Sequence, residues 1–380
     1  MTDKGRRRRA NGEGSIYQRA DGYWVGAYYT YTVSGKRKRQ VVYGRSWDEV
    51  NDKLLEAKEK ARRGIPVPDT SWKLGEYLAY WLENVIKVKR RPATYSLYES
   101  NIRLYLKPGL GKKRLTKLTV ADVQIFINQR IEDGQSARLA QILRTILSSA
   151  LTRAMREELI SRNVARLVEI PSAPRKEIVP WTVAEAKSFL GAAKDDPLYA
   201  AFVLLVLYGV RRGEALGLRW SDVDFDSGEI RIRQQIQRIQ GEIRIGPVKT
   251  TAGKRDLPLL ALVRAALKKR QEEQAKDREF CGEAWPDTDL VFTTRTGRPV
   301  EPSNLVRTYN RLCETYKIRR IRVHDIRHTV GSLLKTLGVP PRDAQVILGH
   351  ARITTTQEIY THVDKEAKQE ALDKIHKLFE

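Results

Sequence analysis

The ten residues 322–331, RVHDIRHTVG, contain two histidines and two arginines, whose side chains can take part in acid–base or phosphate chemistry. His324 and His328 are four residues apart, so they could hold a metal ion, pack in a core or take part in acid–base chemistry. A zinc-binding His-Glu-x-x-His motif has a glutamate after its first histidine, but this chain has Asp325 there and no third ligand close by in the sequence. The stretch therefore indicates acid–base chemistry, and we predict no metal and no other cofactor.

Four other short patterns supply further polar side chains, and their order along the chain is informative. A long apolar segment ends in Gly-x-Arg-x-x-Glu, which contains Arg211 and Glu214. Lys249 leads into a turn between two predicted strands, and a Leu-Gly-His sequence ends at His350. Tyr360 follows ten residues after that histidine. A surface arginine pair or an exposed lysine would explain the first two patterns alone, but chance does not explain the whole set in this order and spacing.

Together with His-x-x-Arg-His, these patterns resemble the tyrosine recombinase family, also called the phage integrase family, over about residues 175–364. The resemblance implies that a scissile DNA phosphate is surrounded by five side chains: Arg211, Lys249, His324, Arg327 and His350. It also implies that Tyr360 is the nucleophile. Its attack on the phosphate would break a DNA strand and form a covalent 3′-phosphotyrosyl intermediate, through which the strand is later rejoined.

The residue types also fit this chemistry on physical grounds. Guanidinium groups such as those of Arg211 and Arg327 match the charge that develops on the non-bridging oxygens of a phosphodiester, which removes the need for a metal. A tyrosine hydroxyl, with a pKa of about 10, needs help to lose its proton, and histidine is suited to take it. Lys249 can return a proton to the leaving 5′ oxygen. Because a phosphotyrosine ester roughly conserves the energy of the phosphodiester bond, the strand can be resealed without ATP.

Several neighbouring residues receive supporting or structural interpretations. We interpret Glu214 as the partner of an arginine of the site, His328 as packing or hydrogen-bonding beneath it, and Asp325 as orienting a neighbour. The pattern Asp-x-Asp-x-Asp at 222–226 begins like a calcium loop, but it lacks the required glycine and closing glutamate, which indicates a polar turn. Tyr208, on the apolar segment, is predicted to lie in the core.

The composition points to a large polyanionic partner. The chain has 380 residues and a formal net charge of +24, with an excess of eight positive charges in each of the stretches 1–66, 67–173 and 174–380. A nucleic acid that touches several domains explains this distribution better than a single basic tail, and a merely basic protein is the alternative. Two cysteines exclude a disulfide framework, and the longest apolar run, 198–210, is too short to cross a membrane. We therefore predict a cytoplasmic, nucleoid-associated protein.

The three stretches are also the three predicted domains, beginning with residues 1–66. This domain has three short strands, with turns at Asp21-Gly22 and Ser34-Gly35, and then a helix from a capping box at 46–49 to about Arg63. By the resemblance it is an arm-type DNA-binding domain, and its basic turn is predicted to contact DNA. We interpret most of its central aromatic side chains as core: Trp24, Tyr28 and Tyr31.

The second and third domains differ in their periodicity. Residues 67–173 have apolar side chains at three- and four-residue steps, which predicts an all-helical domain, similar to the family's core-binding (SAM-like) domain. Breaks are predicted at Arg91-Pro92, Lys107-Pro108-Gly109 and Asp133-Gly134. Residues 174–380 mix helices with strands, as expected for a mixed α+β catalytic domain. The predicted fold class is therefore multidomain and mainly α, with small β-sheets.

In the catalytic domain, strands are predicted on either side of Gly241, and helices dominate from Asn304 onward. The segment 364–380 is predicted to form an amphipathic helix. It could pack on its own domain or, as the resemblance suggests, on a neighbouring copy of the chain.

These observations predict a site-specific DNA recombinase, an integrase that inserts and also excises a mobile element such as a phage genome. Its expected partners are the double-stranded DNA of attachment sites, three further copies of itself in a tetramer on DNA, an excisionase and a host DNA-bending protein. No membrane partner is expected. A type IB topoisomerase would use the same phosphotyrosine chemistry, and a basic regulator with an inactive site would bind DNA without cutting it. A separately tethered N-terminal DNA reader argues against the first alternative, and the complete residue set argues against the second.

Overall fold

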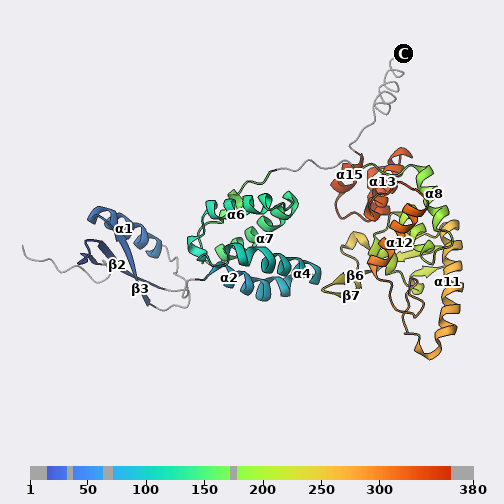
Figure 1. The fold of residues 1–380 in the computed structure, drawn as a ribbon, viewed down its shortest axis with the longest axis horizontal. Coiled ribbons are helices and arrows are strands. Elements are labelled where there is room, and N and C mark those ends of the chain that lie inside the picture. The colour runs from blue at the N-terminus through green and yellow to red at the C-terminus, as the bar shows by residue number, and fades with distance from the viewer. Residues whose placement is uncertain (1–14, 32–36, 63–71, 172–177, 361–380) are drawn as a thin grey trace, which may run out of the picture. The chain divides into compact units, whose positions relative to one another are not determined.

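The residues that the computed structural model describes are 15–31, 37–62, 72–171 and 178–360 (Figure 1). Contacts divide the chain into two compact units, Met1–Arg175 and Lys176–Glu380. The predicted turn at Ser34-Gly35 and the predicted helix at 364–380 lie outside the described residues. Within the described ranges, no helix is both long enough and apolar enough to span a membrane.

A three-stranded antiparallel sheet and one helix form the first folded part of the first unit. The strands pair in sequence order: β1 (Ser15–Gln18), β2 (Trp24–Tyr31) and β3 (Arg37–Gly44). Helix α1 (Trp47–Arg62) follows, and the Ser46 hydroxyl caps it by accepting from the backbone N–H of Glu49 at 3.2 Å. The predicted strands, first turn and helix are confirmed.

The core of this small part is aliphatic, so the interpretation of Trp24 and Tyr28 as core is wrong. Trp24 and Tyr28 are only half-buried, and the side chain of Tyr31 lies outside the described residues. The reason is the close approach of α1 to β2: a Cβ atom at Gly26 would lie 2.8 Å from the Val50 side chain, which leaves room only for small groups. The hydrophobic residues that are fully buried here are Val25, Ala27, Val50 and Leu54.

The rest of the first unit is helical and has a separate hydrophobic core, drawn from residues 74–168. Its helices are α2 (Leu74–Trp81), α3 (Lys87–Lys89), α4 (Pro92–Asn101), α5 (Lys107–Leu110), α6 (Val120–Glu132) and α7 (Ala137–Arg156). Wider π turns, Leu82–Ile86 and Ile102–Leu106, join α2 to α3 and α4 to α5. The predicted breaks at Arg91-Pro92 and Asp133-Gly134 are confirmed.

The predicted break at Lys107-Pro108-Gly109 is wrong, because the helix continues through these residues to Leu110. The π turn before them explains how. Its last bond joins the backbone N–H of Lys107 to the carbonyl of Ile102, so the bonding register shifts just before Pro108, which has no N–H to contribute.

The second unit consists mainly of helices, with two small antiparallel sheets. Its helices are α8 (Val183–Ala193), α9 (Tyr199–Tyr208), α10 (Arg212–Leu216), α11 (Ala261–Cys281), α12 (Pro302–Thr315), α13 (Ile326–Thr336), α14 (Pro341–Leu348) and α15 (Ile353–Tyr360). One sheet has the order β4 (Val223–Asp224), β5 (Glu229–Ile232) and β8 (Arg255–Pro258), and the other pairs β6 (Gln234–Ile239) with β7 (Glu242–Pro247). The chain is thus mainly α with small sheets, as predicted.

Helix α9 lies at the centre of this unit and is buried along most of its length, as its apolar sequence predicts. It packs against α8, α10, α11 and α13. Tyr208 near its end is buried and donates a hydrogen bond to the carbonyl of Pro258 at 2.5 Å, which confirms its core role. A helix held on so many sides gives the residues that follow it a rigid base.

Candidate active site

Arg211 follows α9 directly and is held by an acidic partner in the next short helix. Glu214, in the first turn of α10, accepts from Arg211 Nη1 through Oε1 at 2.6 Å and from the backbone N–H of Arg211 through Oε2 at 3.0 Å. The Glu214 side chain is only 1% exposed, so water screens this ion pair weakly. The predicted pairing of Glu214 with an arginine of the site is confirmed.

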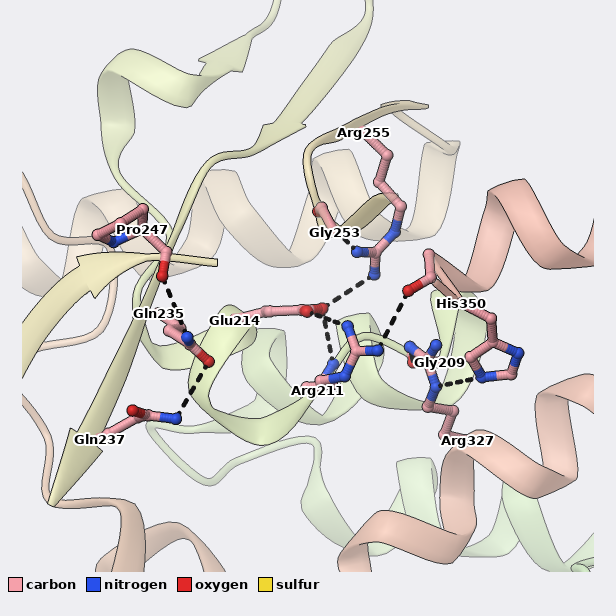
Figure 2. A network of polar contacts seen from close by, with 11 residues as sticks. Gly209, Arg211, Glu214, Gln235, Gln237, Pro247, Gly253, Arg255, Arg327 and His350 are labelled. Carbon is pink, nitrogen blue, oxygen red and sulfur yellow. Dashed lines mark hydrogen bonds and ion pairs between the residues drawn. The ribbon is translucent and has the colours of Figure 1, made fainter. Parts of the chain in front are cut away.

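The carboxyl ends of two helices hold the arginines through main-chain carbonyls. Helix α9 ends at Gly209, whose carbonyl accepts from Arg327 Nη1 at 2.8 Å. Helix α14 ends at Gly349, whose carbonyl accepts from Arg211 Nη2 at 3.1 Å. Both glycines are left-handed, with φ of 60° and 64°, and this conformation ends each helix at the site. Because a helix C-terminus carries partial negative charge, it suits a guanidinium group (Figure 2).

Arg327, His350 and Thr356 form a buried chain of hydrogen bonds. Arg327 Nε donates to His350 Nε2 at 3.1 Å, and His350 Nδ1 lies 2.9 Å from the Thr356 hydroxyl. Arginine can only donate, so the imidazole accepts at Nε2 and, when neutral, carries its proton on Nδ1. Thr356 then accepts that proton in a hydrogen bond. Burial, followed by the positive charges of Arg327 and Arg211, lowers the pKa of His350 to about 3, so the ring is neutral at pH 7.

Positive charge exceeds negative charge in the buried cluster. The guanidinium groups of Arg211 and Arg255 pair with one carboxylate, that of Glu214, and Arg327 lies beyond Arg211 with no carboxylate partner among the described residues (Figure 2). Burial, and then the charges of Arg211 and Arg255, lower the pKa of Arg327 to about 9. Burial raises the pKa of Glu214, but Arg255 and Arg211 outweigh this effect and hold it below its ordinary value, so the carboxylate stays charged. The surplus positive charge fits an anionic ligand.

His324 and His328 lie side by side where α13 begins. His324 belongs to the 3₁₀ turn Val323–Asp325, which runs directly into the helix, and its ring meets the ring of His328 edge-on at 6.0 Å between centroids. The protein packed around His324 lowers its pKa, and the charge of Arg327 lowers it further, although part of the side chain remains exposed. A neutral, accessible imidazole can accept a proton.

The Asp325 carboxylate accepts from Arg322 at 2.8 Å and 3.0 Å, so the neighbour that it orients is this arginine. Across the described ranges, no group of three or more His, Cys, Asp or Glu side chains is arranged to hold a metal ion. The Asp224 carboxylate instead accepts from the backbone N–H groups of Asp226 and Ser227, as in a polar turn.

Lys249 stands just beyond strand β7, with its side chain exposed. The 3₁₀ turn Thr251–Gly253 follows and leads into β8. Arg255, the first residue of β8, donates to the carbonyl of Gly253 at 3.1 Å through Nη1 and to Glu214 Oε2 at 3.0 Å through Nη2. Arg255 thus links the turn after Lys249 to the ion pair between Glu214 and Arg211 (Figure 2).

Tyr360 is the last residue of α15, and its side chain lies outside the described residues. Helix α15 packs against α13 and α14, and Thr356 on it is fully buried. The role of Tyr360 as nucleophile stays a prediction.

The structure brings four of the predicted residues to one place: Arg211, His324, Arg327 and His350. Sequence reasoning missed two buried residues at the site: Arg255 donates to Glu214, and Thr356 hydrogen-bonds to His350. The sequence does contain signals for both. Arg255 stands two residues before the apolar Leu257 on a strand, and so on the same face, while Thr356 stands one helical turn before Tyr360.

Comparison with known proteins assigns both parts of the chain to one family. Residues 181–367 match the Phage integrase family, and residues 73–130 match the family described as Phage integrase, N-terminal SAM-like domain. The Tyrosine recombinase XerC-like protein of Caldanaerobacter subterraneus subsp. tengcongensis is 29% identical over 377 residues, which cover 93% of this chain and 96% of that protein. An integrase of Saccharopolyspora erythraea is 24% identical over 431 residues and covers 98% of both chains.

Solved structures share the fold. The Tn1549 transposon integrase, in complex with a circular intermediate DNA, has a TM-score of 0.69 and 22% identity over 80% of this chain and 100% of that chain. A lambda integrase tetramer bound to a Holliday junction has a TM-score of 0.58 and 19% identity over 93% and 96% of the two chains. This chain belongs to the phage integrase family of tyrosine recombinases. It is accordingly a site-specific recombinase, an enzyme that breaks and rejoins DNA strands.

Proposed function

We propose that this recombinase integrates and excises a mobile element by cutting attachment-site DNA with Tyr360. The observation that carries this proposal is the cluster in which Arg211 and Arg255 share the Glu214 carboxylate, while the carbonyls at two helix C-termini fix Arg211 and Arg327. A phosphodiester under attack gathers negative charge on its non-bridging oxygens, and pre-oriented donors in a water-poor site stabilise that charge most strongly. Arg211 and Arg327 are the donors in this role.

Two other side chains, those of His324 and Lys249, carry out the proton transfers. The Tyr360 oxygen attacks phosphorus, the bond to the 5′ oxygen breaks, and the DNA is left joined to the protein through its 3′ phosphate. A neutral histidine takes the tyrosine proton, and His324, which is partly exposed, suits this role. Lys249 gives a proton to the departing 5′ oxygen. His350 lies against Arg327 and supports the phosphate clamp. Rejoining is the same reaction in reverse, with a 5′ hydroxyl as the nucleophile.

A basic hollow in the helical part of the first unit supports binding along the duplex. It has a volume of about 750 Å³, its floor includes Trp81 and Ile86, and its described lining contains no carboxylate. Cations of this kind bind phosphates without reading sequence. The cationic side chains that line the basic hollow are Lys89, Arg90, Arg144, Arg153, Arg156 and Arg166.

Three domains share the work in this proposal: an arm-binding domain at 1–66, a core-binding domain at 67–173 and the catalytic domain at 174–380. The separate cores of the sheet-and-helix part and the helical part support the first boundary. Four copies meet at the synapse, because exchanging two duplexes takes four strand cuts and each chain has one Tyr360. An excisionase and a host DNA-bending protein set the direction. The reaction takes place in the cytoplasm, on the nucleoid.

Two other functions use parts of the same apparatus. A type IB topoisomerase would relax supercoiled DNA without pairing two sites, and a DNA-binding regulator would form no covalent adduct. The full-length relatives named integrase or recombinase favour recombination over both. Strand exchange between two labelled sites therefore separates this proposal from relaxation alone.

The test is covalent trapping on a nicked duplex that carries the end of the element. Wild-type protein should form a protein–DNA adduct, and Tyr360→Phe should bind the duplex with unchanged affinity and form none. Chelation of divalent metals should leave the adduct yield unchanged. Adduct formation by Tyr360→Phe would remove this tyrosine from the mechanism.

A further inference from the structure

One buried arginine at the site belongs to none of the motifs that define the family resemblance. Arg255 opens strand β8, where it pairs with Ile232 of β5. Its side chain is 3% exposed, because it points to the same inner face of the strand as Leu257. A buried guanidinium needs partners. Arg255 donates hydrogen bonds to Glu214 and Gly253, and it lies close to Gly349.

The first partner connects Arg255 to the phosphate clamp. Arg255 Nη2 donates to Glu214 Oε2 at 3.0 Å, and the same carboxylate binds Arg211 at 2.6 Å through its other oxygen. Arg211 keeps two further bonds that do not involve Arg255, namely its backbone N–H to Glu214 and its Nη2 to the carbonyl of Gly349. If Arg255 were replaced, these two hydrogen bonds would still hold Arg211 in place.

The second and third contacts connect Arg255 to the lysine turn. Arg255 Nη1 donates to the carbonyl of Gly253 at 3.1 Å, at the end of the 3₁₀ turn that follows Lys249. Gly349 lies directly over this arrangement: a Cβ atom there would come within 2.8 Å of both the Ala252 carbonyl and Arg255 Nη1. The turn is thus pressed between Arg255 and the end of α14. The Lys249 side chain itself is exposed, and the residue before it, Val248, is buried in the core and donates its backbone N–H to the carbonyl of Arg233 at 3.2 Å.

Stability alone is a weak reason for an arginine at this position. Burial lowers the pKa of Arg255 in spite of its pairing with Glu214, and its Nε–H is buried without a partner among the described residues. Replacing both partners of a buried ion pair by apolar side chains of similar volume often has no cost in stability, whereas removing one partner is costly when it leaves the other charge without a counter-charge. Glu214 would still be neutralised by Arg211 after such a change.

We propose that Arg255 is a positioning residue that fixes Lys249, the proton donor to the leaving 5′ oxygen, relative to the arginines that hold the phosphate. The inference rests on the proposed function and names a further residue for the same reaction. Arg255 touches neither DNA nor the reacting atoms. It acts by tying the lysine turn to Glu214, and through that carboxylate to Arg211.

The experiment changes the leaving group of the DNA. In one substrate the scissile 5′ oxygen, mapped with wild-type protein, is replaced by sulfur. A thiol has a pKa of about 8.5, so sulfur departs as a thiolate and needs no proton donor. Three controls establish the assay: Lys249→Ala should recover on the sulfur substrate, whereas Arg327→Ala and Tyr360→Phe should not.

Arg255→Met should cleave the ordinary substrate about 10²-fold more slowly than wild type, which is the scale for a displaced catalytic group, with unchanged DNA affinity. On the sulfur substrate it should come within about tenfold of wild type. Arg255→Lys keeps the charge but cannot reach both Glu214 and Gly253, so it should show the same recovery. Arg231→Met, on the neighbouring strand and paired with Asp224 outside the cluster, is the matched control and should cleave both substrates normally.

The inference would be overturned if Arg255→Met and Arg255→Lys lost the same factor in cleavage rate on both substrates. It would also be overturned if these variants cleaved the ordinary substrate at the wild-type rate. The proposed function fails separately, through its own controls. Adduct formation by Tyr360→Phe would show that Tyr360 is not the nucleophile. Failure of Lys249→Ala to recover on the sulfur substrate would show that Lys249 is not the proton donor. A thermal melt of each variant, expected to match wild type for Arg255→Met, shows that the protein compared is folded.

Discussion

The buried arginine cluster of the second unit and the basic hollow of the first unit use the same kind of side chain in opposite ways. In the cluster, Arg327 is 4% exposed and donates to a carbonyl and an imidazole. In the hollow, Lys89 and Arg90 are exposed, and salt screens their attraction for phosphate. Burial with fixed partners suits the stabilisation of a transition state, whereas exposure suits adjustable binding to a long polyanion. In the proposed function, the burial of a cation, more than its residue type, separates catalysis from affinity.

The largest expected effect tests the catalytic side of this comparison. Arg327→Ala should slow covalent adduct formation by about 10² to 10³, the scale for removing one donor to a developing oxyanion. Duplex affinity in a gel shift should stay within about threefold, since exposed cations supply most of the binding. A variant that lost affinity and kept its cleavage rate would reverse the roles assigned to the two regions.

The next effect tests the binding side. The double change Lys89→Gln and Arg90→Gln should weaken duplex binding about tenfold at physiological salt and reduce the slope of log affinity against log salt by about 2. Cleavage at saturating protein should match wild type, because neither side chain belongs to the catalytic unit. Arg103→Gln, which pairs with Glu99 and does not line the hollow, is a matched control. A slope that did not change would exclude the hollow from the DNA interface.

A smaller effect is expected within the cluster itself. Thr356→Val keeps the shape of the side chain but removes the hydroxyl that meets His350 Nδ1. One buried hydrogen bond contributes about 1 kcal/mol net, so adduct formation should slow about fivefold. Thr356→Ser, which retains the hydroxyl, should recover most of the rate. Full activity of the valine variant would show that this contact does not orient the histidine.

The smallest effect concerns acidity. The ordinary pKa of histidine is about 6.5, and that of His350 in the folded protein is about 3. Between pH 3 and pH 6.5 this histidine binds a proton in the unfolded chain but not in the folded protein. Its contribution to the free energy of unfolding is therefore full above pH 6.5 and falls as the pH is lowered toward 3. NMR titration should show the His350 ring still neutral at pH 5. A titration midpoint near pH 6.5 would contradict the prediction and would mean that the His350 ring is in contact with water.

The sequence predicts one class of feature in this molecule well and another class poorly. Arg211, Arg327 and His350 could be predicted because each sits in a short motif with fixed spacing, and the helices could be predicted from their apolar period. For Arg255 and Thr356 the sequence indicates at most which face of the strand or helix they occupy. It does not predict their hydrogen bonds to Glu214 and His350, which lie about forty and six residues away along the chain. The helix through Pro108 was missed for a related reason. A π turn has no simple sequence signal, so a proline there resembles a break.

The two glycine carbonyls that hold Arg327 and Arg211 have a consequence for redirecting such enzymes to new DNA sequences. Main-chain oxygens have no residue identity to lose, so these two anchors survive almost any exchange of neighbouring side chains that preserves the helix ends. Side chains around the two helix ends can therefore be exchanged while both arginines keep these anchors. The anchors themselves depend on the left-handed turns at Gly209 and Gly349, where any other residue would be strained and crowded.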